Sequence, residues 1–158
     1  KSTITAILKF ILKFRYRLDL CIFSIDDFYK TKLERKKMSE RIHPLFLTRG
    51  VPGTHDLKFI NQTINNLKKK KFKPVMIPRF DKSIDDRAKK TKWVKIKKPP
   101  NIIIFEGWCI GARPQKYNIL KKSLNIIEKK HDTDLRWRKQ VNEQLKKITK
   151  KFLIKSIN

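Results

Sequence analysis

Acidic side chains follow three separate apolar segments of this 158-residue chain. They are Asp26 and Asp27 after LCIFSI (20–25), Asp81 after KPVMIP (73–78), and Glu106 at the end of the run NIIIFEG (101–107). Carboxylate oxygens bind Mg²⁺ directly or through water, and a carboxylate can accept the proton of a hydroxyl. Phosphoryl transfer needs mainly alignment and charge neutralisation, so these residues fit that chemistry.

A second chemical signal lies at the first residues, Lys1, Ser2 and Thr3, which open an amphipathic helix. They match the end of the phosphate-binding pattern G-x-x-x-x-G-K-[ST], in which the lysine reaches phosphate oxygens and the hydroxyl binds magnesium. The glycines of that pattern would lie before Lys1. Taken alone, the three residues read equally as an ordinary helix start.

The elements that must position these side chains alternate between helices and strands. Apolar residues at helical spacing, Ile4, Ile7, Leu8, Ile11 and Leu12, predict a helix, and the unbroken apolar run at 101–105 predicts a strand buried on both faces. The order indicates an α/β domain with a mainly parallel sheet flanked by helices. Because ligands bind beyond the carboxyl ends of such strands, we expect Asp26, Asp27, Asp81 and Glu106 on one rim.

The remaining segments also carry readable patterns. We expect helices over 30–42, from Leu57 to Leu67, near 117–130 and near 134–153, a loop over 43–56, and a short strand around Trp93–Ile96. One domain over residues 1–158 follows from the length. His43 and His131 have no supporting context and are expected in surface or loop positions.

Composition narrows the class of protein. The net charge is +27, carried almost wholly by lysine and spread over the chain, beside abundant isoleucine and asparagine. A/T-rich codons produce that trio, so codon bias is favoured over a dedicated nucleic-acid surface. Cys21 and Cys109 lie far apart without ligand-like spacing, which fits a reducing cytoplasm, and no apolar run is long enough to cross a membrane.

Six segments together are more specific than any one of them. They are SIDDFY (24–29), RGVPGTHD (49–56), PRFDKS (78–83), DDR (85–87), FEGWCIGARP (105–114) and WRKQVNEQL (137–145). In order and rough spacing the chain resembles D-glycerate 3-kinase-like P-loop kinases, and more loosely uridine and pantothenate kinases. The resemblance spans essentially the whole chain and implies the P-loop NTPase fold, ATP, Mg²⁺ and a small hydroxy acid as acceptor.

The resemblance also implies roles for individual residues. Lys1 becomes the P-loop lysine and Ser2 a magnesium ligand, with Thr3 beside them at the phosphates. Asp26 matches the aspartate of the D-x-F-Y turn and is the expected base and metal ligand, while Asp27 remains the alternative. Either could instead cap the following helix. Glu106 looks like the carboxylate that orders the water shell of magnesium.

The loops are expected to supply the acceptor site and a lid. Residues expected to bind the carboxylate or hydroxyls of the acceptor are Arg49, His55, Asp56, Arg79, Asp81 and Arg87. Plainer readings stay open: Asp56 as a helix cap, Arg79 paired with Asp81, and Arg87 as loop scaffolding. A lid is expected over about 107–140. There Arg113, Arg136 and Arg138 would neutralise the charge that develops in the transition state of phosphoryl transfer, and Arg138 would be a catalytic residue. Trp108 and Trp137 are expected to pack, and Cys109 to take no part.

The chain departs from the family pattern at both ends. The P-loop glycines, the first strand and a C-terminal part of the pattern are not among these 158 residues, so we expect the 158-residue chain to have little kinase activity by itself. Other readings remain open: a uridine- or pantothenate-type kinase, a basic nucleic-acid-binding module, or a catalytically dead relative.

Overall fold

The computed structural model describes residues 2–152, and its contacts divide the chain into two compact units. Unit 1 combines the described residues up to Phe28 with Leu57–Gly107, and unit 2 combines Tyr29–Asp56 with the described residues from Trp108 onward. Lys1 and residues 153–158 lie outside the described part. A single domain over residues 1–158 stays a prediction.

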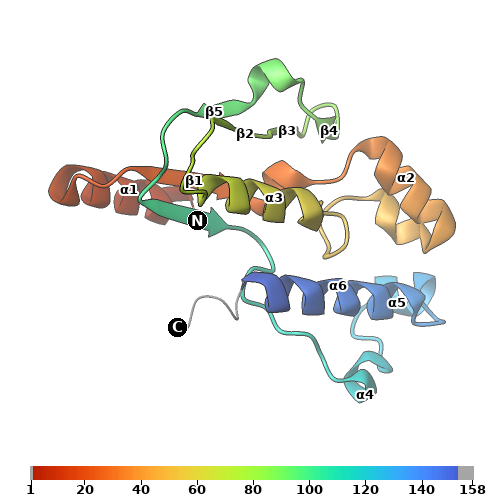
Figure 1. Ribbon diagram of the computed structural model, residues 1–158. Coiled ribbons are helices and arrows are strands. Elements are labelled where there is room, and N and C mark those ends of the chain that lie inside the picture. The colour runs from red at the N-terminus through yellow and green to blue at the C-terminus, as the bar shows by residue number, and fades with distance from the viewer. Residues whose placement is uncertain (1, 153–158) are drawn as a thin grey trace. The chain divides into compact units, whose positions relative to one another are not determined.

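Unit 1 is a mixed α/β unit built on one parallel strand pair (Figure 1). Its elements are α1 (Ser2–Tyr16), β1 (Leu20–Ser24), η1 (Ile25–Phe28), α3 (Leu57–Leu67), β2 (Val75–Ile77), β3 (Phe80–Asp81), β4 (Asp86–Arg87), η3 (Lys90–Lys92), β5 (Val94–Ile96) and β6 (Ile102–Glu106). β1 and β6 pair in parallel from Leu20↔Ile102 to Ser24↔Glu106. The prediction that these two apolar runs form parallel strands is confirmed.

The expectation of a mainly parallel sheet is correct only for that pair. Among the described residues, β2 pairs with β5 and β3 with β4, and both pairs are antiparallel. All four strands lie in one short excursion of the chain between α3 and β6. A parallel pair needs a crossover of a dozen or more residues, usually a helix, whereas a short reversal produces an antiparallel pair.

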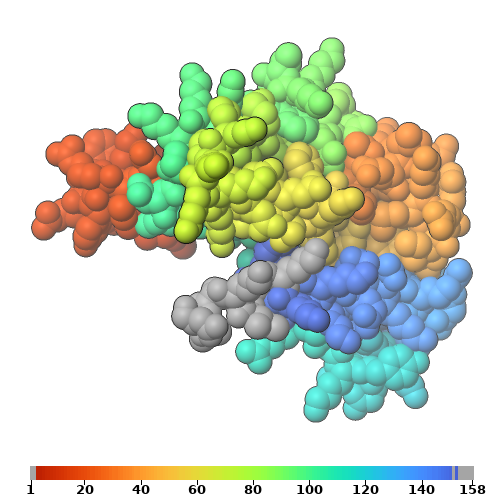
Figure 2. Space-filling view, in the orientation of Figure 1, coloured from red at the N-terminus to blue at the C-terminus, as the bar shows by residue number. Residues whose placement is uncertain are grey.

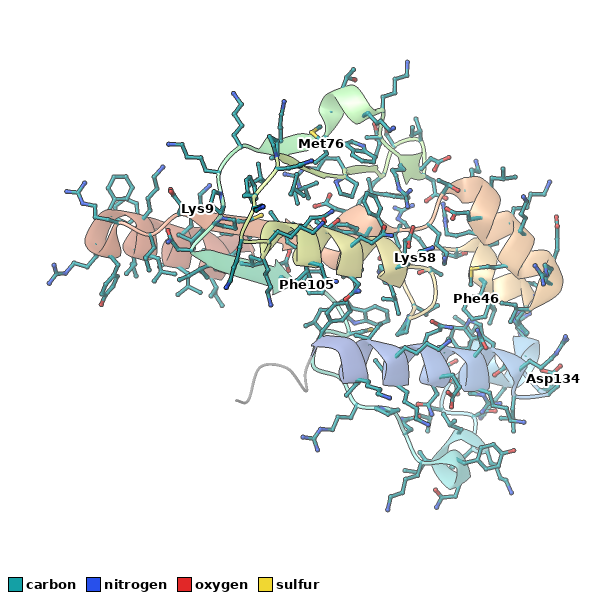
Figure 3. All side chains as sticks on the ribbon, in the orientation of Figure 1. Lys9, Phe46, Lys58, Met76, Phe105 and Asp134 are labelled. Atoms are coloured by element: carbon teal, nitrogen blue, oxygen red, sulfur yellow. The ribbon has the colours of Figure 1, made fainter. Side chains whose placement is uncertain are left out.

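Aromatic rings hold the core of unit 1 together. Phe23 and Phe28 are 2% and 0% exposed, and their ring centroids lie 5.5 Å apart. Phe23 also contacts Phe105, labelled in Figure 3, and Phe28 meets Phe59 edge-on. Because Phe23 ends the apolar part of β1 and Phe28 closes η1, these contacts fix the turn that carries Asp26 and Asp27.

The helix α1 forms as predicted but leaves its apolar side chains open. Ile4, Ile7, Leu8 and Ile11 are 65%, 54%, 41% and 45% exposed. Figure 2 shows this helix (red) with side chains facing solvent on the visible side. Within the described residues, the periodicity therefore predicts the helix correctly but not a buried face.

Unit 2 consists of helices and loops. Its elements are α2 (Lys32–Arg41), η2 (Pro44–Leu47), α4 (Tyr117–Leu120), α5 (Ile126–His131) and α6 (Arg136–Phe152). α2 begins with a capping box, in which Thr31 accepts from the N–H of Glu34 and the Glu34 carboxylate accepts from the N–H of Thr31. The helix expected over 117–130 is broken, because Asn125 caps a new helix by accepting from the N–H of Glu128.

Candidate functional site

Two segments of unit 1 bring carboxylates to the same edge of the parallel pair. Ser24 is the register partner of Glu106, so both strands reach their carboxyl ends together. The 3₁₀ turn η1 follows at once and carries Asp26 and Asp27, with the Ser24 hydroxyl oxygen accepting from the N–H of Asp26 at 3.3 Å. Of the four carboxylates expected on one rim, Asp26, Asp27 and Glu106 lie where the parallel pair ends, whereas Asp81 belongs to the antiparallel hairpin β3–β4.

Asp27 forms an ion pair with Arg79, in the segment that precedes β3. Its side chain is 14% exposed, and its Oδ2 accepts from Arg79 Nη1 at 2.8 Å. Burial raises the pKa of Asp27, against the opposing effect of Arg79 and of hydrogen bonds from the backbone of Phe80 and Ser24. Arg79 thus pairs with Asp27 rather than with Asp81, the partner considered from the sequence.

Asp26 is the more open of the two aspartates. Its side chain is 31% exposed, and its Oδ2 lies 3.6 Å from Lys82 Nζ. A carboxylate that must receive a proton from an incoming hydroxyl needs such access. Asp26 and Asp27 differ in exposure and in their partners because they are consecutive residues of the 3₁₀ turn η1. They do not lie on opposite faces of a strand.

The opening helix points its first turn toward this edge. Only residues 17–19 separate the end of α1 from the start of β1, and the N–H of Leu18 bonds back to the carbonyl of Leu12. A connection this short reverses the chain, so α1 runs opposite to β1 and contacts it. Ser2 and Thr3 therefore lie in the helix turn nearest the carboxyl ends of the strands, while Lys1 lies outside the described residues.

Asp81 closes a turn in the hairpin β3–β4. Its Oδ1 accepts from the N–H and the hydroxyl of Ser83, at 3.1 and 2.5 Å. The Ser83 hydroxyl and N–H lower the pKa of Asp81. Arg87, its neighbour in the hairpin, is half-buried with its guanidinium carbon 5.4 Å from the Phe59 ring centroid. A substrate-binding role for Asp81 and Arg87 stays a prediction.

The segment RGVPGTHD forms a tightly bonded loop within unit 2. Thr54 is fully buried, donates its hydroxyl to the carbonyl of Val51, and accepts from the N–H of Gly50. His55 is 2% exposed and stacks on Tyr29 with ring centroids 4.4 Å apart. Arg49 and Asp56, also expected to bind the acceptor, lie half-buried at either end of the loop.

Gly53 in this loop is required by its backbone. Its φ is +110°, a conformation that residues with a side chain rarely adopt. A Cβ there would lie 3.1 Å from Cγ of Gln144 and 3.2 Å from the ring of Phe46. The glycine thus allows close packing inside unit 2.

Comparison with known proteins shows which kinases the chain is similar to. No protein-family model matches the chain. It is 32% identical over 152 residues to the Probable ATP-dependent kinase TDA10 of Saccharomyces cerevisiae, covering 85% of this chain and 51% of that protein. It is 31% identical over 140 residues to the chloroplastic D-glycerate 3-kinase of Arabidopsis thaliana, covering 82% and 30%.

A solved structure agrees with the sequence comparison. The D-glycerate 3-kinase from Cryptococcus neoformans matches with a TM-score of 0.74 and 28% identity, covering 91% of this chain and 54% of that one. Over most of its length, the chain is homologous to D-glycerate 3-kinase. It spans between 30% and 54% of the length of these three kinases.

In this glycerate kinase homologue, Arg138 has a structural position. It is 6% exposed and donates from Nε to Asp132 Oδ2 at 2.7 Å, from Nη2 to the carbonyl of Asp132 at 2.7 Å, and from Nη1 to the carbonyl of Leu120 at 2.9 Å. These bonds turn the guanidinium toward the interior of unit 2. The catalytic role expected for Arg138 stays a prediction that this burial does not favour.

The other two arginines of the expected lid are more open. Arg136 is exposed and pairs with Asp134, labelled in Figure 3, and hydrogen bonds from Arg136 lower the pKa of that aspartate. Arg113 lines a cavity of about 500 Å³ in unit 2. Val51 and Pro52 of RGVPGTHD line the same cavity, as do Trp108 of FEGWCIGARP and Val141 of WRKQVNEQL, so three of the quoted segments meet there.

Several polar residues differ from their expected positions. His43, expected in a surface or loop position, lies in a loop, but it is 4% exposed: its Nδ1 accepts from the N–H of Leu45, and its Nε2 lies 3.9 Å from Asp132 Oδ1. Arg35 is fully buried and donates to the carbonyls of Lys30 and Leu47. No sequence signal separates this arginine from its charged helical neighbours.

The two tryptophans Trp108 and Trp137 differ in burial, and both cysteine thiols have a raised pKa. Trp108 is 58% exposed, so it does not pack as expected within the described residues, whereas Trp137 is half-buried. Burial raises the pKa of both Cys21 and Cys109 to about 11, which leaves little reactive thiolate at neutral pH. Among the helices described, none has the length and apolarity needed to cross a membrane.

Proposed function

We propose that the protein containing this chain is an ATP-dependent kinase that phosphorylates a hydroxyl of a small hydroxy acid, D-glycerate first among them. The observation that carries the proposal is the edge shared by Asp26 and Glu106, with the first turn of α1 directed toward it. Homology to D-glycerate 3-kinase supports the choice of acceptor.

Asp26 is the proposed base, because it is the accessible aspartate of the turn while Asp27 holds Arg79. The acceptor hydroxyl oxygen bonds to the γ-phosphorus of ATP as the bond from that phosphorus to the β–γ bridging oxygen breaks. ADP leaves, and the hydroxyl proton passes to the Asp26 carboxylate.

The donor set at this edge fits magnesium. Glu106 and Asp26 offer carboxylate oxygens, which Mg²⁺ prefers, and Ser2 lies in the helix turn that faces them. When bound, Mg²⁺ would neutralise charge on the phosphates of ATP. Lys1, Thr3, Arg113 and Arg136 are proposed to contact those phosphates, and Arg49, His55, Asp56, Arg79, Asp81 and Arg87 to serve acceptor binding.

An acceptor panel tests the proposal. The protein at its natural length, with ATP and Mg²⁺, is offered D-glycerate, glycerol, uridine and pantothenate, and ADP release is measured. We expect D-glycerate to give the highest kcat/KM. Turnover of uridine or pantothenate in its place would move the protein to the other kinase class, and turnover of none of the four would contradict the proposal.

A further inference from the structure

A lysine that none of the expected roles includes lies against the proposed base. The ammonium of Lys82 is 3.6 Å from Asp26 Oδ2, and its side chain is 64% exposed. We propose that Lys82 binds the carboxylate of the acceptor while Asp26 receives the proton of its hydroxyl. The inference rests on the proposed function and names the group that would select an acid over a neutral alcohol.

The backbone on both sides of Lys82 is anchored. Before it, Arg79 bonds to Asp27, and β3 contacts the η1 turn that carries Asp26. After it, Ser83 donates its N–H and its hydroxyl to Asp81. The hydrogen bonds before and after Lys82 thus hold the backbone in a position that places its side chain beside Asp26.

Stability alone does not account for this arrangement. An ion pair this exposed contributes little to folding, because both groups remain hydrated. An ammonium carries three N–H donors, and the contact with one carboxylate oxygen uses at most one of them. The others stay available to an anion that arrives next to the base.

The cationic side chains of Arg79 and Lys92, which belong to the same excursion as Lys82, have other partners. The guanidinium of Arg79 is bonded to Asp27, and the ammonium of Lys92 lies 3.6 Å from Asp81. Lys82 lies next to Asp26 itself. A hydroxy acid has its carboxylate and its hydroxyl only a few bonds apart, so an adjacent cation and base match the two groups.

The test compares an acidic and a neutral acceptor in the natural-length protein. We expect Lys82→Ala to raise the KM for D-glycerate about 10- to 100-fold, the loss of a hydrogen bond to a charged group, with the KM for ATP unchanged. Transfer to glycerol should be the same in both proteins. Lys82→Arg should restore part of the glycerate affinity, and Lys89→Ala, an exposed lysine of the same excursion, should change nothing.

The outcomes separate this inference from the proposed function. Turnover of D-glycerate with an unchanged KM in Lys82→Ala would overturn the role of Lys82 and leave the kinase intact. An equal fall in kcat for both acceptors would show that Lys82 serves the transferred phosphoryl group, which also overturns the inference. If the unaltered protein phosphorylates neither acceptor, the proposed function fails and the inference with it.

Discussion

Replacing Asp26 with asparagine is expected to lower kcat for D-glycerate roughly 10²- to 10⁴-fold, the usual contribution of a general base. Asparagine keeps the size of the side chain but cannot accept the proton of the hydroxyl. The KM for ATP should change little, because the proposed contacts with the phosphates of ATP come from other residues, Lys1 and Thr3 among them. Steady-state kinetics on the natural-length protein measure both quantities.

Asp27→Asn is the matched control, one residue away in the same turn. Asp27 bonds to Arg79 Nη1 and is mostly buried, so its replacement should weaken the attachment of β3 to η1. We expect a lower midpoint of thermal unfolding and a smaller loss of kcat than in Asp26→Asn. A large loss of kcat in Asp27→Asn, with Asp26→Asn within about threefold of the unaltered protein, would exchange the two roles.

The second large effect concerns stability. Asp132→Ala is expected to lower the free energy of unfolding by about 3–5 kcal/mol, as breaking a buried pair does. Asp132 is fully buried and accepts from Arg138 Nε and from the N–H groups of Trp137 and Arg138 at the start of α6. Its removal leaves the Nε of a buried guanidinium and two helix N–H groups without their acceptor. Urea unfolding followed by circular dichroism measures the loss.

Asp134 supplies the control, two residues along the chain. It is exposed and pairs with the exposed Arg136, so Asp134→Ala should leave the free energy of unfolding nearly unchanged. Equal losses in the two variants would contradict the structural role of the Asp132–Arg138 pair. So would a full loss of activity in a stable Asp132→Ala protein, which would favour a catalytic Arg138.

Local patterns in the sequence predict most elements of this fold. The apolar runs at 20–25 and 101–107 predict β1 and β6 correctly as strands. The burial on both faces expected for 101–105 is not found among the described residues, because every residue of β6 is only half-buried. Helical spacing predicts α3, and the capping box at Thr31 and Glu34 starts α2. The pairing of the other strands does not follow from local patterns. The antiparallel partners of β2 and β3 depend on where the chain reverses direction between them, which composition does not encode.

The candidate site is predictable in part for the same reason. Carboxyl ends of parallel strands meet at one edge, so the grouping of Asp26 and Glu106 follows from the order of strands. The choice between Asp26 and Asp27 depends on a turn and on Arg79, a contact across 52 residues of sequence. No local pattern distinguishes Lys82 from the many other lysines of the chain. The burial of Arg138 and His43 depends on contacts with Asp132, which is far from His43 in the sequence.

Binding of Mn²⁺, a spectroscopic substitute for Mg²⁺, tests most directly whether the acidic edge of β1 and β6 holds a divalent ion with nucleotide. Electron paramagnetic resonance on the natural-length protein with ADP gives the dissociation constant. We predict that Glu106→Gln weakens Mn²⁺ binding roughly 10- to 100-fold, as the loss of a group that orders the metal's ligands does, whereas Glu40→Gln in α2 has no effect. Equal Mn²⁺ affinity in the Glu106→Gln and unaltered proteins would contradict the metal site on which this account of phosphoryl transfer depends.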